Sequence, residues 1–357
     1  MGGNCVLVEK YKDKGLIYLC EKTKEGRATN FANTYILAIN NKAFIIDTSC
    51  KKDRLKEIKA ILKNYSAYVI LCSHYHNDHI ANNGRLASKK SPIIYHENAA
   101  SKVRYLRTNS TGQMLEMFAQ MDKKDFLLRI GFFGKKLPHI LTKRKIYSEY
   151  IAKSILFITS YLYSVINIGI IYSGKKYITY LKDKEQRPLH LKVKNIMGWE
   201  LDDNLFAIST PGHTDCHLCF YDKKNKIFFA GDSLNFLNPN DIQFGNIRES
   251  ALSRKKILDI VKAEKIKILC QGHYPPIEGT ENIIRYITAV IENHNKVYNL
   301  IKTEAKRQKT LPFKELYKKI YSIKDPLIQK LKKITFPRST LVFLDVYLLK
   351  ILQEEDL

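Results

Sequence analysis

HYHNDH at residues 74–79 decides how this sequence is interpreted, because it places three imidazoles and one carboxylate within six residues. The apolar run Tyr68–Cys72 precedes it, and the small, polar run IANNG at 80–84 follows it. Neutral imidazoles and carboxylates are the usual ligands of Zn²⁺ and related metals. A buried strand that ends in such groups holds them on a rigid support. The stretch therefore predicts a metal site, and a His-rich surface loop is the simpler alternative.

Three further ligand candidates, His213, Asp232 and His273, each follow a predicted strand. Strand ends gathered at one edge of a sheet are a natural place to build a site. Either histidine alone would more often be a loop or core residue than a ligand. Their joint placement after strands is what predicts that they complete the site begun at residues 74–79.

The order of predicted elements indicates layered sheets with helices outside. Asn40-Asn41 reads as a hairpin turn between two strands, and residues 52–62 show apolar residues at a helical period. Strands are predicted at 16–19, 34–39, 43–46, 68–72, 92–95, 189–196, 205–209, 217–221, 226–230 and 266–270. Helices are predicted at 52–62, 248–264, 280–307, 313–322, 326–334 and 338–354.

The segment from about 100 to 185 differs from its surroundings, and Ser154–Ser173 within it carries no charge. A run of that length could cross a membrane as a helix. However, basic residues flank both ends, and one crossing would put the two halves of the predicted metal site on opposite sides of a bilayer. We therefore expect the segment not to cross. We expect it to pack over the mouth of the site, to form a dimer surface, or to lie in a membrane interface. A β-rich segment is a further alternative, since Ile, Val and Tyr are frequent here.

Composition sets broader bounds on the protein. The chain has 357 residues and a formal net charge of +25, which reflects either a compositional bias or attraction to nucleic acid or an anionic membrane. Its seven cysteines lack the spacing of a disulfide framework, which predicts reduced thiols in a cytoplasmic protein. Residues 1–14 lack the apolar core of a signal peptide, so export is not expected.

The H-x-H-x-D-H signature and the later His, Asp and His resemble the metallo-β-lactamase superfamily, over about 5–100 and 186–280. The glyoxalase II and lactamase-like β2 branches are the alternatives within it. The resemblance implies an α/β fold, a four-layer αβ/βα sandwich over residues 1–280. It also implies a largely helical, hydrophobic insertion at about 100–185 and a helical C-terminal region at 281–357.

The resemblance also assigns roles to individual residues. It implies a first metal held by His74, His76 and His213, a second held by Asp78, His79 and His273, with Asp232 bridging them. Asp47 matches an acidic position that supports the site from behind the ligands. Two Zn²⁺ ions are the expected cofactors, with Fe or Mn as alternatives.

Two cations a few ångströms apart activate a bridging water as a hydroxide nucleophile. We therefore expect a hydrolase whose bridging hydroxide attacks an ester, thioester or lactone-type bond, with Asp78 as the catalytic residue that orients the hydroxide or accepts its proton. A His at the third ligand position argues for hydrolysis over oxygen reduction, because flavo-diiron relatives carry an acidic residue there. A mononuclear iron site of the sulfur-dioxygenase kind is a further alternative.

The substrate is open between two classes. The apolar insert favours a small-molecule or lipid-like acyl substrate, and its 145–175 segment could also form a homodimer or touch the inner membrane face of a cytoplasmic protein. Residues 310–321 are similar to the helical tail of the lactamase-like β2 branch, which includes single-strand RNA endonucleases. This resemblance and the net charge favour instead a metal-dependent ribonuclease or phosphodiesterase acting on single-stranded nucleic acid. A catalytically silent membrane adaptor would bind no metal, and the intact ligand set argues against it.

Two residues near the motifs have simpler interpretations. His217 could contact substrate or belong to the sheet, and its position favours the sheet. Cys216 is interpreted as a packing residue.

Overall fold

The computed structural model describes residues 5–8, 11–21, 31–104, 174–235, 245–308, 311, 313–333 and 343–355. They fall into two compact units. The first contains the described residues within Met1–Leu106, Val165–Asn235 and Arg248–Ala289. The second contains those within Phe236–Ile247 and Val290–Leu357. Most of the predicted insertion, including Ser154–Ser173, lies outside the described residues.

The first sheet begins as an antiparallel meander and continues as parallel strands. Its order is β1 (Cys5–Val8), β2 (Leu16–Glu21), β3 (Thr34–Ile39), β4 (Lys42–Ile46), β5 (Ala67–Leu71), β6 (Ile93–His96) and β7 (Ile178–Leu181). Strands β4 to β7 run parallel. The predicted β3–β4 hairpin turns at Asn40 and Asn41, whose φ values of 48° and 61° fit the left-handed geometry that tight hairpins need.

The second sheet contains β8 (Arg187–Pro188), β9 (Met197–Asp202), β10 (Leu205–Ser209), β11 (Leu218–Asp222), β12 (Ile227–Gly231), β13 (Ile268–Gln271) and β14 (Ile277–Glu278). These strands pair in chain order, and β12 and β13 are parallel. The predicted strand at 189–196 is wrong. The chain turns there, because Asn195 adopts a left-handed φ of 62° and the Leu189 amide bonds the Ile196 carbonyl.

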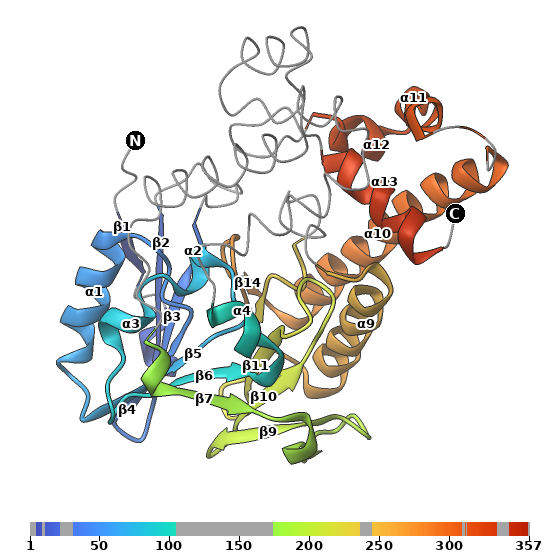
Figure 1. The fold of residues 1–357 in the computed structure, drawn as a ribbon. Helices are drawn as coiled ribbons and strands as arrows, with labels where there is room; N and C mark the ends of the chain where they lie inside the picture. Colours follow the sequence, from blue (N-terminus) through green and yellow to red (C-terminus); the bar gives the residue numbers. More distant parts are fainter. Residues whose placement is uncertain are drawn as a thin grey trace, which may run out of the picture. The chain divides into compact units, whose positions relative to one another are not determined.

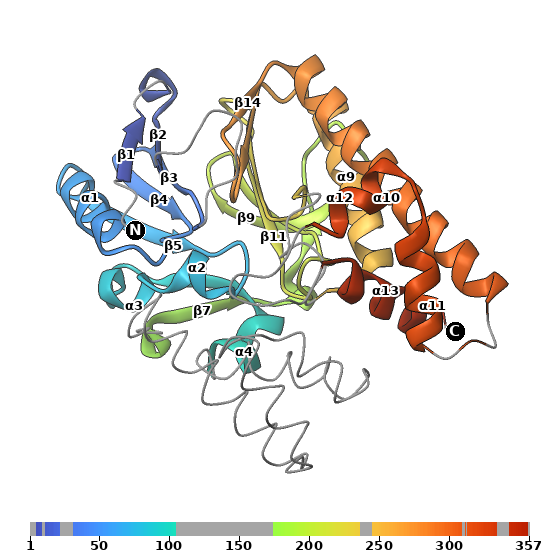
Figure 2. The same ribbon diagram turned by 90° about the horizontal axis from the view of Figure 1, so that it is seen from above.

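Helices cover the outer faces of the two sheets (Figures 1 and 2). The first sheet carries α1 (Lys52–Leu62), α3 (Asn83–Leu86) and α4 (Ala100–Arg104), and the second carries α9 (Ile247–Glu264) and the start of α10 (Thr280–Arg307). Short 3-10 turns lie at Lys12–Lys14, Glu97–Ala99, Lys175–Tyr177 and Asp183–Glu185.

Two apolar cores hold these layers together. Between the sheets, Phe44 and Leu71 of the first pack with Phe220 and Phe229 of the second, all buried. Outside the first sheet, Ile58 of α1 joins a separate cluster of buried residues. Burial of this apolar surface is the main favourable contribution to folding. The αβ/βα sandwich predicted from the sequence is confirmed.

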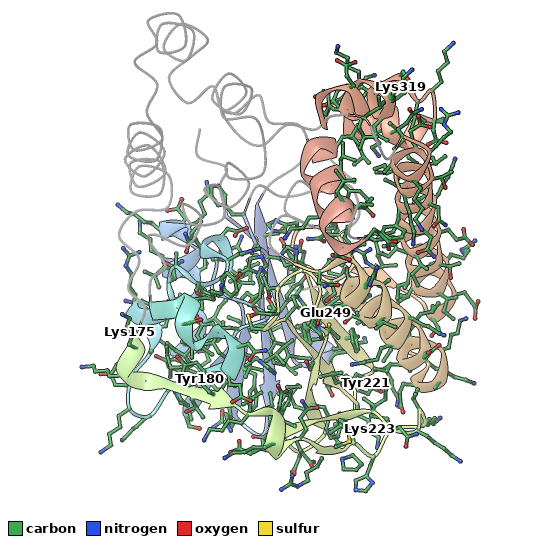
Figure 3. The ribbon with its side chains drawn as sticks, turned by 45° about the vertical axis from the view of Figure 1, so that its right-hand side comes forward. Lys175, Tyr180, Tyr221, Lys223, Glu249 and Lys319 are labelled. Carbon is green, nitrogen blue, oxygen red and sulfur yellow. The ribbon has the colours of Figure 1, made fainter. Side chains whose placement is uncertain are left out.

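Strand β7 lies within the predicted insertion, yet it pairs in parallel with β6 and belongs to the first sheet. Lys175, just before β7, and Tyr180, within it, show where the chain returns to the sheet beside α4 (Figure 3). A pocket of about 340 Å³ lies where the chain leaves and re-enters the sheet, lined by Ala100, Ser101, Val103, Lys175, Ile178 and Tyr180. The core fold therefore resumes at Ile178, inside the predicted insertion.

The second unit consists of helices. It contains the C-terminal part of α10, with α11 (Phe313–Ser322), α12 (Pro326–Leu331) and α13 (Phe343–Glu354). Asp325 caps α12 by accepting a hydrogen bond from the Leu327 amide, and its other oxygen lies 2.7 Å from Lys296 Nζ. These elements confirm the predicted helical C-terminal region. Among the residues that the structure describes, no helix is long and apolar enough to cross a membrane.

The core between the sheets generates a stability prediction. Phe220 is fully buried there, whereas Leu252 on α9 is 69% exposed. Replacing Phe220 by Ala should lower the free energy of unfolding by about 3–5 kcal/mol, through lost burial and the cavity left behind. The matched Leu252→Ala change should stay within about 0.5 kcal/mol. Urea denaturation followed by circular dichroism measures both, and equal losses would contradict this account of the core.

Candidate metal site

The candidate ligands lie on loops that follow four strands of the first unit, and Asp47, which supports them, follows a fifth. Asp47 follows β4, and residues 73–79 follow β5, with Asn77–Ile80 forming the short helix α2. In the second sheet, His213, Asp232 and His273 follow β10, β12 and β13. Because strands that run in the same direction end at the same edge of a sheet, these loops meet although they are far apart in sequence.

Two groups of side chains could hold metal ions. The first contains His74, His76, His213 and Asp232, and the second contains Asp78, His79 and His273. Within each group the possible ligand atoms lie within 4.8 Å of one another. The shortest approach is 3.0 Å, between His76 Nδ1 and His213 Nε2. The structure thus brings all seven predicted ligands together, and their binding of metal stays a prediction.

Asp232 lies between the two groups. Its Oδ2 is 3.6 Å from His213 Nε2 on one side, and 3.5 Å and 3.4 Å from the Nε2 atoms of His79 and His273 on the other. One carboxylate oxygen therefore faces imidazoles of both groups. This is the position that the resemblance to the metallo-β-lactamase superfamily assigns to a bridging ligand.

The site contains buried polar atoms that the protein leaves unsatisfied. Within the described part of the chain, His74 Nε2, His79 Nε2 and both carboxylate oxygens of Asp232 are buried and make no hydrogen bond. Buried polar atoms normally have partners, because an unmet one costs free energy. Imidazole nitrogens and carboxylate oxygens that converge in this way fit bound cations, so the residues present suit a metal centre.

Asp47 explains why the imidazoles present their Nε2 atoms to the site. Its Oδ2 accepts hydrogen bonds from His79 Nδ1 and from Ser73 Oγ, both at 2.7 Å. Since the Ser73 hydroxyl donates to Asp47, its oxygen accepts from His74 Nδ1, 2.9 Å away. One buried carboxylate therefore orients two candidate ligands, one directly and one through a serine. Such groups behind a ligand fix its tautomer and ring orientation.

Comparison with known proteins agrees with this geometry. A model of the metallo-beta-lactamase superfamily matches residues 28–114, which include the HYHNDH stretch. A metallo-beta-lactamase family protein from Thermus thermophilus is similar in structure, with a TM-score of 0.51 and 16% identity over 91% of this chain and 89% of that one. The chain has the metallo-β-lactamase fold.

A second solved structure is similar over half of its length. The stereoselective inverting sec-alkylsulfatase Pisa1 from Pseudomonas sp. matches with a TM-score of 0.55 and 12% identity, over 99% of this chain and 50% of that one. At such identities the likeness concerns the fold alone. Membership of the glyoxalase II or lactamase-like β2 branch stays a prediction. The metallo-β-lactamase fold and the ligand groups together indicate a metal-binding hydrolase.

Electrostatics divide the imidazoles of this metallo-β-lactamase-fold protein into two kinds. Burial and the neighbouring histidines hold the pKa of His74 and His76 well below the usual range, so both are neutral. Burial alone would also lower the pKa of His79 and His273. Nearby carboxylates, Asp232 foremost, outweigh burial and raise the pKa of His273 to about 10 and that of His79 well above its usual value. A metal ion binding there would replace those protons.

The site is open to solvent on one side. His76, Asn77 and Asp78 are partly exposed, whereas His74, His79 and His273 are buried. The Asp78 side chain is 20% exposed, and its Oδ2 lies 3.3 Å from His273 Nε2. Burial would raise the pKa of Asp78, but His79 and His273 outweigh burial and hold it below the usual value, so the carboxylate is ionised.

Two residues that support the site were not identified from the sequence. Ser73 carries the contact between Asp47 and His74 described above. Asn33, directly before β3, donates its side-chain amide to the carbonyls of Gln271 and Tyr274, at 3.1 Å and 2.9 Å. It thereby holds the loop that carries His273. Ser73 could have been noticed from its place between strand and motif, but Asn33 has no local signal.

Two neighbours of the ligands are packing residues. Tyr75 and Cys216 are buried in the apolar cluster outside the first sheet. The packing interpretation of Cys216 is therefore confirmed.

Gly272 generates a prediction about metal content. A Cβ added at Gly272 would lie 2.0 Å from Asp232 Oδ1, so Gly272→Ala should displace the shared carboxylate and lower the zinc bound per chain. Gly279→Ala is the control, since its Cβ would find its nearest atom at 3.4 Å. The left-handed φ of +84° should cost that control about 1–2 kcal/mol of stability without loss of metal. Elemental analysis of zinc-reconstituted proteins measures the difference, and equal zinc in both variants would contradict it.

Asp47 generates a second prediction. The backbone amide of Ser73 donates to Asp47 Oδ1 at 2.9 Å, while His79 and the Ser73 hydroxyl donate to Oδ2. Asp47→Asn replaces one of these oxygens by a donor, so the contacts at one of the two oxygens must be lost. Zinc affinity should fall about 10–100-fold, as for other groups that orient metal ligands. The control is Asp202→Asn, which removes a peripheral pair with Lys42 at 2.9 Å. Competition with a chromophoric chelator measures both affinities, and an unchanged affinity in Asp47→Asn would show that the ligands orient themselves.

Proposed function

We propose that this protein is a dinuclear zinc-dependent hydrolase of ester, thioester or lactone-type bonds, with Fe or Mn as alternative metals. The observation that carries the proposal is the place of Asp232, whose Oδ2 lies 3.4–3.6 Å from imidazole nitrogens of both ligand groups. A carboxylate so placed suits two ions that share one ligand. The unsatisfied buried atoms of His74 and His79 support the same proposal.

When bound, two such cations supply a hydroxide nucleophile at neutral pH and polarise the oxygen of the bond to be cleaved. The residues of the chain provide the rest. Asp47 and Ser73 hold His74 and His79 in one tautomer, and Asp78 lies at the open side of the site. Because Asp78 is ionised, with its pKa below the usual value, it is better suited to accept a hydrogen bond and orient the nucleophile than to store a proton.

An apolar acyl substrate is the preferred class. The support is compositional, since Ser154–Ser173 within the insertion carries no charge and could cover an acyl chain or lie against a membrane or a second subunit. A cytoplasmic enzyme that works at the inner membrane face would combine these features. The alternative is a phosphodiesterase or ribonuclease for single-stranded nucleic acid, favoured by the net charge of +25.

A substrate panel tests the proposal. Zinc-reconstituted protein should bind two zinc ions per chain and hydrolyse acyl esters and thioesters, with turnover increasing from short to long acyl chains. Asp232→Asn should lower turnover by more than the roughly 10–100-fold expected for a residue behind the ligands. The control His96→Asn, a buried histidine paired with Asp183 at 3.0 Å, should keep activity.

The same panel separates the alternatives. Zinc-dependent cleavage of single-stranded RNA at low salt, without acyl hydrolysis, would select the nuclease. A protein that binds no metal would contradict both hydrolases.

A further inference from the structure

His217 is a buried histidine close to the candidate ligands but outside both groups. It lies just before β11, and its side chain is fully buried. Nε2 accepts a hydrogen bond from the backbone amide of Asp232 at 3.1 Å. Nδ1 lies 2.9 Å from Thr210 Oγ1 and 3.0 Å from Ser233 Oγ. Both nitrogens are therefore engaged, and one of them holds the residue shared by the two ligand groups.

These contacts determine the tautomer of the ring. A backbone amide can donate but not accept, so Nε2 must carry a lone pair and Nδ1 must carry the proton. The two hydroxyls at Nδ1 can accept that proton's hydrogen bond.

The ring also has little room to move. A Cβ added at Gly231 would lie 2.7 Å from His217 Nε2, so the backbone before Asp232 passes directly against the imidazole. On another side the ring stacks on His74, with centroids 5.4 Å apart and planes 28° apart. His217 thus lies between a candidate ligand and the backbone of another.

The place of Asp232 in the chain shows why it needs such a contact. Strand β12 ends at Gly231, whose left-handed φ of 48° turns the chain out of the sheet. The Asp232 amide then points at an imidazole on a neighbouring loop, and not at a strand carbonyl. An error in this one backbone position would move the carboxylate relative to both ligand groups at once.

We propose that His217 is a positioning residue, which fixes the backbone of Asp232 and thereby the carboxylate that faces both ligand groups. The inference rests on the proposed metal-dependent function. It assigns His217 no contact with substrate or metal, and it accounts for a neutral, buried histidine beside a metal centre.

Two substitutions separate positioning from packing. The side-chain oxygen of Gln can reach the place of Nε2, whereas that of Asn reaches only the place of Nδ1. His217→Gln can therefore keep the acceptor for the Asp232 amide, while His217→Asn keeps the contacts to Thr210 and Ser233 and withdraws from Asp232. His96→Asn is the control, because His96 is buried and paired with Asp183.

Zinc affinity is measured by chelator competition on the four proteins, and melting temperature on their zinc-free forms. His217→Asn should bind zinc about 10–100-fold more weakly than wild type, while His217→Gln and His96→Asn stay close to it. Equal zinc affinity in His217→Asn and His217→Gln would overturn the inference. Two affinities that match wild type would mean that the contact to Asp232 is not needed. Two affinities that fall together with the melting temperature would mean that His217 only packs.

A second measurement uses the zinc-free protein. Long-range ¹H–¹⁵N spectra should show His217 protonated at Nδ1, and the Asp232 amide signal should shift in His217→Asn but not in His217→Gln. Protonation at Nε2 would overturn the inference. A wild-type protein that binds no zinc contradicts the proposed function instead, and these spectra then decide the His217 contact independently.

Discussion

Three imidazole nitrogens lie within 3.6 Å of one oxygen of Asp232, and the rest of the site depends on how the fold tolerates this crowding. Polar groups buried so densely do not stabilise themselves, because several of their atoms make no hydrogen bond. The free energy that holds them in place comes from elsewhere. The apolar core between the sheets fixes the strands, and hydrogen bonds behind the ligands fix the loops at the strand ends.

The sequence predicts the ligands better than it predicts their supports. HYHNDH is a local pattern, and His213, Asp232 and His273 can each be found because a recognisable strand precedes them. Asn33 bonds the Gln271 carbonyl across 238 positions of the chain, and no local pattern reports such a pairing. The sequence favours a sheet position for His217, and its hydrogen bond to Asp232 depends on the pairing of β11 with β12, which no local pattern reports.

The errors in secondary structure have local causes. Residues 189–196 alternate apolar and basic side chains as a strand does, but the left-handed Asn195 turns the chain. Strand β7 has the same Ile- and Tyr-rich composition as the segment before it, so nothing in its composition marks the return to the sheet. It was recognised from its pairing with β6.

The pocket beside α4 bears on how the chain between α4 and β7 can vary. Val103, near the point where the chain leaves the first sheet, and Ile178, where it has returned, line the same pocket. Because the two ends are neighbours, the entropy of closing the loop between them grows only with the logarithm of its length. The intervening segment can therefore lengthen, shorten or be replaced in evolution with little penalty to the sheets. The strand ends that carry the candidate ligands can stay unchanged when it does.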